Sequence, residues 1–467
     1  MPRRGLRKPK DVVPQPKIFH VNSPISTGPE GQVNEMEKFI RNEKEVKAND
    51  EEETKKIHEN ILMNFDSTRY LHHVALCGIL GGVFLGFLGT FTITLLPCHN
   101  VIAEPQYWYE FWLQCELGFL PLFAAVSIFN SSSWMNTEAV KNVKNYIRLY
   151  MVGFVSSTIS ISSVYYFWRF LIQYPHPMPF QGVLLAFELL MILYIHLWYQ
   201  FPKALRVNNS FRKRLKFTFH ALLISGLVPF QYQIITIFFL KVSPEYQWGV
   251  AFCLPIIREL NLALMLKMTK IASAGKFSRV SCSVSHYMNS RHALYVAIII
   301  GTIATFETSL VILGIDFLIN LYISIKLIYL RKWKTETTRS EQVELLQELV
   351  LNEHVEFIMP ISYFVVFLAA YYGPNGQYIG NIKYGGWAFH AITEIENFYN
   401  NIAQLFFADL SSLLLCAVLL WLSCKINIFR AYYQMVKKGW IEMAIQTAFL
   451  LDLVSNMTNF SPSLTLL

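Results

Sequence analysis

The stretch CLPIIRELNLALMLK, residues 253–267, decides how the chain is interpreted, because it is apolar like a membrane span and yet holds three polar side chains. Arg258, Glu259 and Asn261 interrupt a run that otherwise consists mostly of Leu, Ile, Ala and Met. An ionised residue at the centre of a membrane helix costs about 2.5 to 3.5 kcal/mol on insertion scales. Whether this stretch crosses a membrane therefore depends on what flanks it.

Basic residues on either side of the apolar runs alternate along the chain. They fill the links at 141–148, 203–216 and 267–291, whereas PCHNVIAEPQY at 97–107 and QYPHPMPFQ at 173–181 contain no Lys or Arg. Cytoplasmic links of membrane proteins carry an excess of Lys and Arg. The alternation predicts a cytoplasmic N-terminus and requires a crossing at 253–267.

The composition places the whole chain in the same class. Of its 467 residues, 53% are hydrophobic and 15% are charged, where soluble domains carry about a quarter charged residues. Apolar runs of about 17 to 25 residues, the length that a helix needs to cross a bilayer, recur throughout. We predict an all-α, polytopic helical membrane protein with about ten spans, at 74–97, 107–130, 149–172, 181–201, 217–240, 247–266, 294–311, 312–330, 355–372 and 402–423.

The stretch 294–330 leaves the number of spans open. As one helix it would be about 56 Å long, more than a single crossing needs. Basic residues flank it on both sides, with Arg291 before it and Arg331 after it, so an even number of crossings fits better. We expect a hairpin that turns near residues 306–309, which gives ten spans; one long helix would give nine.

The chain divides into three parts. Residues 1–72 are charge-dense and predict a largely disordered cytoplasmic tail, with a cytoplasmic partner as one use for it. Residues 73–430 form the membrane domain, in which 331–353 predicts a cytoplasmic amphipathic helix and 373–401 an extracytoplasmic loop. Residues 431–467 predict an amphipathic tail that lies at the interface. No apolar segment follows the basic start directly, so we expect no cleavable signal peptide.

These assignments place the protein in the plasma membrane or an endomembrane, with both termini cytoplasmic. Two N-x-S/T sequons, at Asn456 and Asn459, bear on that placement. Glycosylation there would put the C-terminus outside. We expect both sequons to be unused.

The charged trio in 253–267 supplies the first candidate site. Arg258 and Glu259 are about 100° apart on a helix, so we expect each to find its partner on another helix. Asn261 shares the face of Arg258, and Pro255 frees a backbone carbonyl one turn earlier. Two interpretations remain open: Arg258 binds an anionic or zwitterionic ligand, or it locks the bundle by pairing with Glu116, Asp316 or Asp409.

Further polar residues lie inside the other predicted spans. Asp316 and Asn320 are one helical turn apart, an arrangement that can hold a cation or proton between helices or simply join two helices by hydrogen bonds. Asp409 forms a polar patch with Ser411 and Ser412, and Glu116 is a further deep acid. The candidate pathway is thus Arg258, Glu259, Asn261, Asp316, Asn320, Asp409 and Glu116.

Deep acids outnumber deep bases in this reading, which favours a secondary transporter or channel-like protein for a small solute or cation. The alternative is a multi-span receptor or scaffold in which the same residues only lock the helices. Phosphate-binding, nucleophile and metal-ligand motifs are absent from the sequence, so we expect neither an enzyme nor a cofactor nor a metal site. The net charge of +8 comes from membrane-flanking residues and predicts the lipid bilayer, not nucleic acid, as the partner.

Overall fold

The computed structural model describes residues 80–88, 112–135, 143–167, 181–201, 203–273, 277–302, 306–333, 339–372 and 395–459. In these ranges the chain is helical apart from short turns and contains no strand. The tail 1–72 and residues 373–394 of the predicted loop lie outside the described residues, whereas residues 395–401 of that loop belong to α15. The helices are η2 Gln114–Phe119, α4 Leu120–Trp134, α5 Val143–Phe167, α6 Gln181–Gln200, α7 Lys203–Val207, α8 Asn209–Lys241, η4 Pro244–Tyr246, α9 Gln247–Ala251, α10 Cys253–Ala272, α11 Phe277–Thr302, α12 Phe306–Trp333, α13 Arg339–Tyr372, α15 Ile395–Cys424 and α16 Ile428–Asn459.

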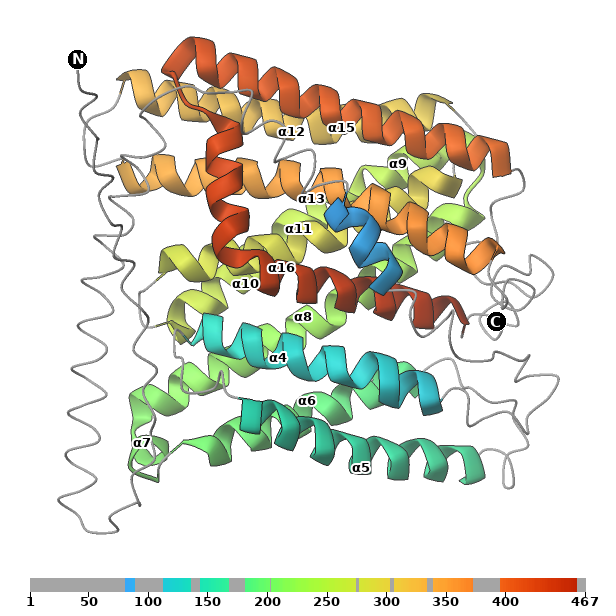
Figure 1. Cartoon of the computed structure of the whole chain (residues 1–467), viewed down its shortest axis with the longest axis vertical. Helices are drawn as coiled ribbons and strands as arrows, with labels where there is room; N and C mark the ends of the chain where they lie inside the picture. Colours follow the sequence, from blue (N-terminus) through green and yellow to red (C-terminus); the bar gives the residue numbers. More distant parts are fainter. Residues whose placement is uncertain are drawn as a thin grey trace, which may run out of the picture. The chain divides into compact units, whose positions relative to one another are not determined.

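Several of these helices could cross a bilayer by length and composition, as the apolar runs predict. Five stretches in the described part of the chain are long and apolar enough: Glu116–Trp134, Pro244–Ala272, Thr308–Lys332, Glu341–Ala369 and Glu396–Cys424. The long helices run along one common direction (Figure 1). The helical membrane class is therefore supported, whereas the count of ten spans stays a prediction.

Helix α11 lies at the centre of this arrangement. Every residue from Ser283 to Gly301 is buried, and the helix packs against α4, α8, α10, α13, α15 and α16. The helix that contains most of the predicted span 294–311 is longer on its N-terminal side, since α11 begins at Phe277, and the next helix, α12, begins at Phe306. Residues 277–293 are polar enough to resemble a link, but a helix surrounded by other helices can satisfy polar side chains with its neighbours.

Arg291 shows how such a residue is accommodated. It was expected to flank a span on the cytoplasmic side, but it is only 1% exposed. Pro229 lies inside α8 and has no N–H, which leaves the carbonyl of Ser225 without its helical partner. Arg291 Nη1 donates to that carbonyl, Tyr287 Oη donates to it at 3.3 Å, and the guanidinium lies 3.6 Å from the centre of the Tyr287 ring. A proline in one helix thus explains a buried arginine in another.

The predicted amphipathic link 331–353 is not a separate helix. It enters α13, which begins at Arg339 and continues through Pro360 to Tyr372. The apolar residues that suggested an amphipathic helix are buried as their spacing predicts: Val343, Leu346, Leu349 and Val350. They pack against α12, α15 and α16, so the face that we assigned to the membrane surface contacts protein instead.

Helix α16 also departs from its prediction. Its first part runs across the bundle, and the rest turns to run along the other helices (Figure 1). This later part packs against η2 and α4: the Phe449 ring lies 5.5 Å from that of Phe119 on η2, and Gln446 Nε2 donates to Asn130 Oδ1 on α4 at 2.8 Å. The tail that was expected to lie at the interface is therefore part of the helical core.

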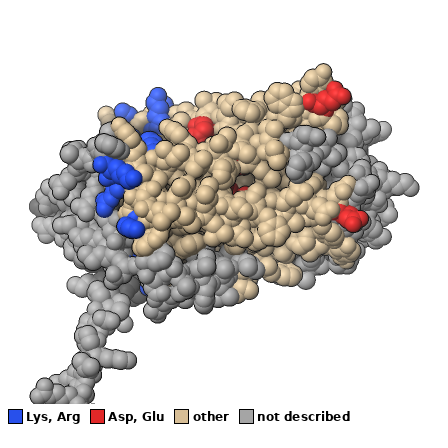
Figure 2. Space-filling view, turned by 90° about the horizontal axis from the view of Figure 1, so that it is seen from above, with Lys and Arg blue, Asp and Glu red and all other residues tan. Residues whose placement is uncertain are grey.

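Basic side chains gather at one end of the face that Figure 2 shows. Figure 2 shows Lys and Arg at one end of the visible face and Asp and Glu mainly elsewhere. Arg214 joins helices at the basic end, since its Nε donates to the carbonyl of Ala272 at 2.8 Å and its Nη2 to that of Met135 at 2.6 Å. These carbonyls lie at the C-terminal ends of α10 and α4, where a positive charge is favourable.

Two glycines bring the helical segment 80–88 close to α13. A Cβ on Gly86 would lie 2.6 Å from Val365 Cβ and 2.9 Å from the Ser362 carbonyl, and one on Gly82 would lie 3.0 Å from Ile361 Cβ. Ser362 Oγ donates to the Gly82 carbonyl at 3.0 Å. The spacing Gly82-x-x-x-Gly86 is the small-residue pattern that lets membrane helices approach closely, a signal that the sequence analysis did not use.

We expect Gly86→Ala to destabilise the protein by about 1 to 3 kcal/mol, because the added methyl group meets backbone and a β-branched side chain. Thermal unfolding of the detergent-solubilised protein measures this. Gly314→Ala is the matched control, since a Cβ on Gly314 has nothing within 4 Å. Equal unfolding midpoints for the two variants would show that the close approach does not hold the segment.

Candidate functional site

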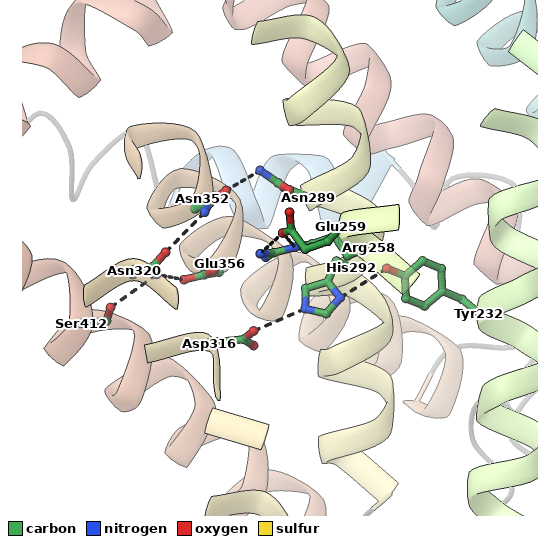
Figure 3. A network of polar contacts seen from close by, with 10 residues as sticks. All are labelled: Tyr232, Arg258, Glu259, Asn289, His292, Asp316, Asn320, Asn352, Glu356 and Ser412. Carbon is green, nitrogen blue, oxygen red and sulfur yellow. Dashed lines mark hydrogen bonds and ion pairs between the residues drawn. The ribbon is translucent and has the colours of Figure 1, made fainter. Parts of the chain in front are cut away.

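A cluster of buried polar side chains lies where α10, α11, α12, α13 and α15 meet (Figure 3). It contains four carboxyl groups, one guanidinium and several amide, hydroxyl and imidazole groups. Its members are Arg258 on α10, Asn289 and His292 on α11, Asp316 and Asn320 on α12, Asn352, Glu353 and Glu356 on α13, and Asp409 and Ser412 on α15.

Arg258 is the charged base of this cluster, and its side chain is only 4% exposed. Contrary to prediction, it pairs with its neighbour Glu259: Nη2 and Nε lie 2.7 Å and 3.1 Å from Glu259 Oε1. The aliphatic stem of an arginine is long enough to bring its guanidinium around the helix, which the angle between Cβ atoms does not capture. The Glu259 side chain is 58% exposed, so this pair connects the outer face of α10 to the core.

Arg258 also faces the interior of the cluster. Its guanidinium interacts electrostatically with Asp316 and Glu356 and points toward Glu356 in Figure 3. Of the three acids predicted as its locking partners, Asp316 is therefore near it. Arg258 therefore provides a positive charge near Asp316 and Glu356, although it forms its ion pair with Glu259.

Asp316 is joined to α11 through a histidine. His292 Nε2 lies 3.4 Å from Asp316 Oδ1, and His292 Nδ1 lies 3.3 Å from Tyr232 Oη on α8. Both ring nitrogens of this buried imidazole therefore face a group that can exchange a proton. The tautomer decides which nitrogen donates.

Asn320 is the central hydrogen-bonding residue of the cluster and has no exposed surface. Its Nδ2 donates to Glu356 Oε2 at 2.7 Å and lies 3.5 Å from Ser412 Oγ. Asn352 Nδ2 donates to Asn320 Oδ1 at 3.4 Å, and Asn289 Nδ2 donates to Asn352 Oδ1. Asn320 thus links α12 to α13 and α15, and Asn352 extends the network to α11.

Two further acids complete the cluster. Ser412 Oγ donates to Glu353 Oε1 at 3.1 Å, while Glu353 Oε2 and Asp409 Oδ2 are buried without a hydrogen-bond partner. Asp409 interacts electrostatically with Glu356, Asp316 and Glu353. These four carboxyl groups therefore influence one another's charge.

The charges of the cluster do not balance. The cluster holds four carboxyl groups and one guanidinium, which interacts with Asp316 and Glu356 and is already paired with Glu259. A buried carboxylate without a partner costs several kcal/mol, and carboxyl groups this close cannot all stay ionised. Protons or a bound cation must therefore neutralise part of the cluster.

The structure brings together only part of the predicted pathway. Arg258, Asp316, Asn320 and Asp409 are in the cluster, with Glu259 at its edge. Asn261 points elsewhere: its Nδ2 donates to Gln231 Oε1 on α8 at 2.7 Å, which joins α10 to α8. Glu116 lies apart as well and has its hydrogen-bond partners on α5.

Sequence reasoning missed half of the cluster. Asn352, Glu353 and Glu356 were assigned to a cytoplasmic link or to the start of a span, and Asn289 and His292 to a basic link. The motif NEHVE at 352–356, embedded between VELLQELVL and FIMPISYFVV, could have revealed the first group. Its polar residues interrupt a face that is apolar before and after them, which is unusual for a surface helix.

No protein-family model, no curated protein and no solved structure matches the chain. In the part of the chain that the structure describes, no group of three or more His, Cys, Asp or Glu side chains is arranged to hold a metal ion. The function is therefore argued from the geometry and charge of the cluster alone.

Variants that each remove one charged group test whether the cluster holds more negative than positive charge. We expect Arg258→Gln to destabilise the protein by about 3 kcal/mol or more, since the acids lose their one fixed positive neighbour. Asp409→Asn should change stability by less than about 1 kcal/mol or raise it, because it removes a carboxyl group that has no base as partner. Thermal unfolding in detergent compares the two variants, and a loss for Asp409→Asn as large as that for Arg258→Gln would contradict the surplus of negative charge.

Proposed function

We propose that the protein is a membrane transporter or channel-like protein that moves protons through the cluster formed by Asp316, Asn320, Glu353, Glu356 and Asp409. The observation that supports this most is the surplus of buried carboxyl groups over the one guanidinium. Acids buried in membrane domains mark ion pathways and proton relays. A cluster that needs neutralising charge can take up and release protons as part of its work.

The hydrogen bonds of the cluster fit a proton better than a larger solute. His292 bridges Asp316 and Tyr232, and Asn320 bridges Glu356 and Asn352. An imidazole can exchange protons near neutral pH, and His292 lies here within hydrogen-bond reach of Asp316 and Tyr232. Arg258 would keep a positive charge beside the relay, so that the acids are not all protonated at once.

Access to the cluster is best supported from the basic end. His286, Asn289 and His292 recur every three residues in the half of α11 that is nearer the basic end, and all three are buried polar residues on the way to Asp316. Beyond the cluster the core is apolar: the Tyr363 and Phe398 rings lie 6.1 Å apart and the Phe367 and Phe398 rings 3.9 Å apart, against Gly301. This aromatic layer would have to open for protons to leave on the other side.

The orientation of the protein in the membrane is part of the same proposal. Lys and Arg gather at one end (Figure 2), which the positive-inside rule assigns to the cytoplasm. With the ten predicted spans the N-terminus is cytoplasmic. The later part of α16 runs along the bundle away from the basic end (Figure 1), which supports a further crossing and a C-terminus on the other side. The proposed position of the C-terminus differs from the expectation that both termini are cytoplasmic, and α16 is not among the five stretches that are long and apolar enough to cross a bilayer.

Proton flux into vesicles tests the function. Purified protein reconstituted with a pH-sensitive dye inside should admit protons when a potassium gradient with valinomycin sets the membrane potential. We expect Glu356→Gln and Asp316→Asn to lower the flux by about tenfold or more, because each removes a group that must gain and lose the proton.

Glu341→Gln is the matched control, since it makes the same change on α13 at a side chain that is 46% exposed and pairs with Lys326. It should leave the flux unchanged. Folded, reconstituted parent protein that passes no more protons than empty vesicles would refute the proposal. A receptor or scaffold with a purely structural polar network would then account for the cluster better.

Antibody access tests the topology. A short epitope appended after Leu467 should be stained on intact cells if the protein is at the cell surface, or protected from added protease in sealed microsomes if it is internal. An epitope before Met1 should behave in the opposite way. Equal behaviour of the two ends would restore the expectation of two cytoplasmic termini and make the later part of α16 a non-crossing helix.

A further inference from the structure

Glu259 lies on the outer face of α10, and the proton route does not explain why it is there. Its side chain is 58% exposed, whereas that of Arg258 beside it is 4% exposed. Helix α10 belongs to Pro244–Ala272, one of the stretches that are long and apolar enough to cross a bilayer. An exposed carboxyl group in such a stretch contacts lipid unless another protein surface covers it.

The depth of Glu259 makes contact with lipid costly. Trp248 and Lys267 are exposed on either side of it and are residue types that mark the two interfaces of a membrane. At 1.5 Å per residue, Glu259 lies about 16 Å from Trp248 and about 12 Å from Lys267 along the helix. The hydrocarbon core is about 30 Å thick, so this carboxyl group lies near its middle.

Arg258 satisfies only one oxygen of this carboxyl group. Its Nε and Nη2 both donate to Glu259 Oε1, at 3.1 Å and 2.7 Å. Among the described residues, no hydrogen bond reaches Glu259 Oε2. This oxygen can therefore accept a hydrogen bond from a surface that lies outside the single chain.

A hydrogen-bond donor is exposed at nearly the same depth on the neighbouring helix α8. Asn261 Nδ2 donates to Gln231 Oε1 at 2.7 Å, and Asn261 lies about 3 Å from Glu259 along the axis of α10. Gln231 is exposed, and in the described part of the chain its Nε2 forms no hydrogen bond. Each chain thus exposes one free acceptor and one free donor near the middle of the membrane.

The acceptor and the donor lie at opposite edges of the exposed face of α10. Residues that are two positions apart on a helix lie about 160° apart around its axis. Asn261 contacts α8, so Glu259 lies at the edge of α10 that is away from α8. Gln231 lies beyond the other edge.

Between these two edges, the exposed residues have the spacing of a coiled coil. They follow one another at intervals of three and four residues, and all are exposed: Cys253, Ile256, Leu260, Ala263 and Lys267. Helices with this spacing pack along their length, and residues at the edges of the seam then contact the other helix. Two copies of α10 in one membrane run in the same direction, so they can form a parallel pair along this seam.

We propose that the exposed face of α10 binds the same face of a second copy of this chain, forming a two-fold symmetric dimer in the membrane. In a two-fold interface, residue i of one copy contacts residue j of the other, and j contacts i. The symmetry places the Glu259 edge of each copy beside the Gln231 edge of the other. The free carboxyl oxygen then accepts from the free amide, which removes both polar groups from lipid.

Oxidative cross-linking of the full chain in membranes tests the seam, because Cys253 lies on it and is exposed. The lipid-soluble oxidant copper phenanthroline, with oxygen, should join two Cys253 thiols as a disulfide and give a covalent dimer. Cys253→Ser should lose this dimer. Cys416→Ser, the same change at a buried cysteine on α15, should retain it.

Gln231→Glu tests the polar contact, because the new carboxylate still accepts from Asn261 but offers the second copy no donor. We expect the dissociation constant of the dimer to rise by about tenfold or more, since two carboxylates then face each other. Light scattering of the purified protein in detergent, over a range of concentrations, measures this constant. Adding Glu259→Gln exchanges donor and acceptor and should restore most of the affinity.

A parent protein that stays monomeric and gives no cross-link through Cys253 would overturn the proposal. So would a dimer whose dissociation constant does not change in Gln231→Glu, or a Cys253 cross-link to a different protein alone. If Gln231→Glu does not fold, the cross-link through Cys253 still decides the question. Neither measurement depends on transport, so a failure of the proton-flux proposal leaves this one intact.

Discussion

The structure depends on one electrostatic constraint: four acids from three helices must be buried beside a single arginine. Asp316, Glu353, Glu356 and Asp409 would repel one another if all were charged, and burial strengthens that repulsion. Arg258 attracts two of them, and the amides of Asn320 and Asn352 fix the spacing between the helices. The way in which α10, α11, α12, α13 and α15 pack together thus depends on the need to neutralise buried charge as well as on the burial of apolar side chains.

The sequence predicted the class of protein because a helix that crosses a bilayer needs a certain length and a low average polarity. These requirements do not depend on which helices are its neighbours. The run that holds Arg258 was correctly expected to be a helix, and Asp316, Asn320 and Asp409 were correctly placed inside helices. What the sequence could not supply was adjacency. Asn261 and Arg258 were expected to share a site because they lie on the same face of α10. Asn261 instead forms a hydrogen bond with α8, since different parts of that face contact different helices.

The missed residues share a physical reason. Periodicity and window averages find helices that have an apolar side toward lipid, but α11 and the first half of α13 are surrounded by protein and can be polar where they meet polar partners. Arg291 therefore looked like a flank and Glu353 like the end of a link, although both are buried. The later part of α16 was misjudged for the same reason: its polar residue Gln446 meets Asn130 on α4 instead of water.

The proline in α8 and the arginine in α11 have a consequence for how the chain is made. An arginine without a partner is expensive to leave in a membrane, and Arg291 finds its acceptor in the Ser225 carbonyl that Pro229 leaves free. Synthesis proceeds from the N-terminus, so α8 emerges from the ribosome before α11 and the acceptor already exists when the donor arrives. Arg291 can therefore be neutralised as it enters, and moving α8 to a later position in the chain would leave the Arg291 guanidinium without this acceptor during insertion.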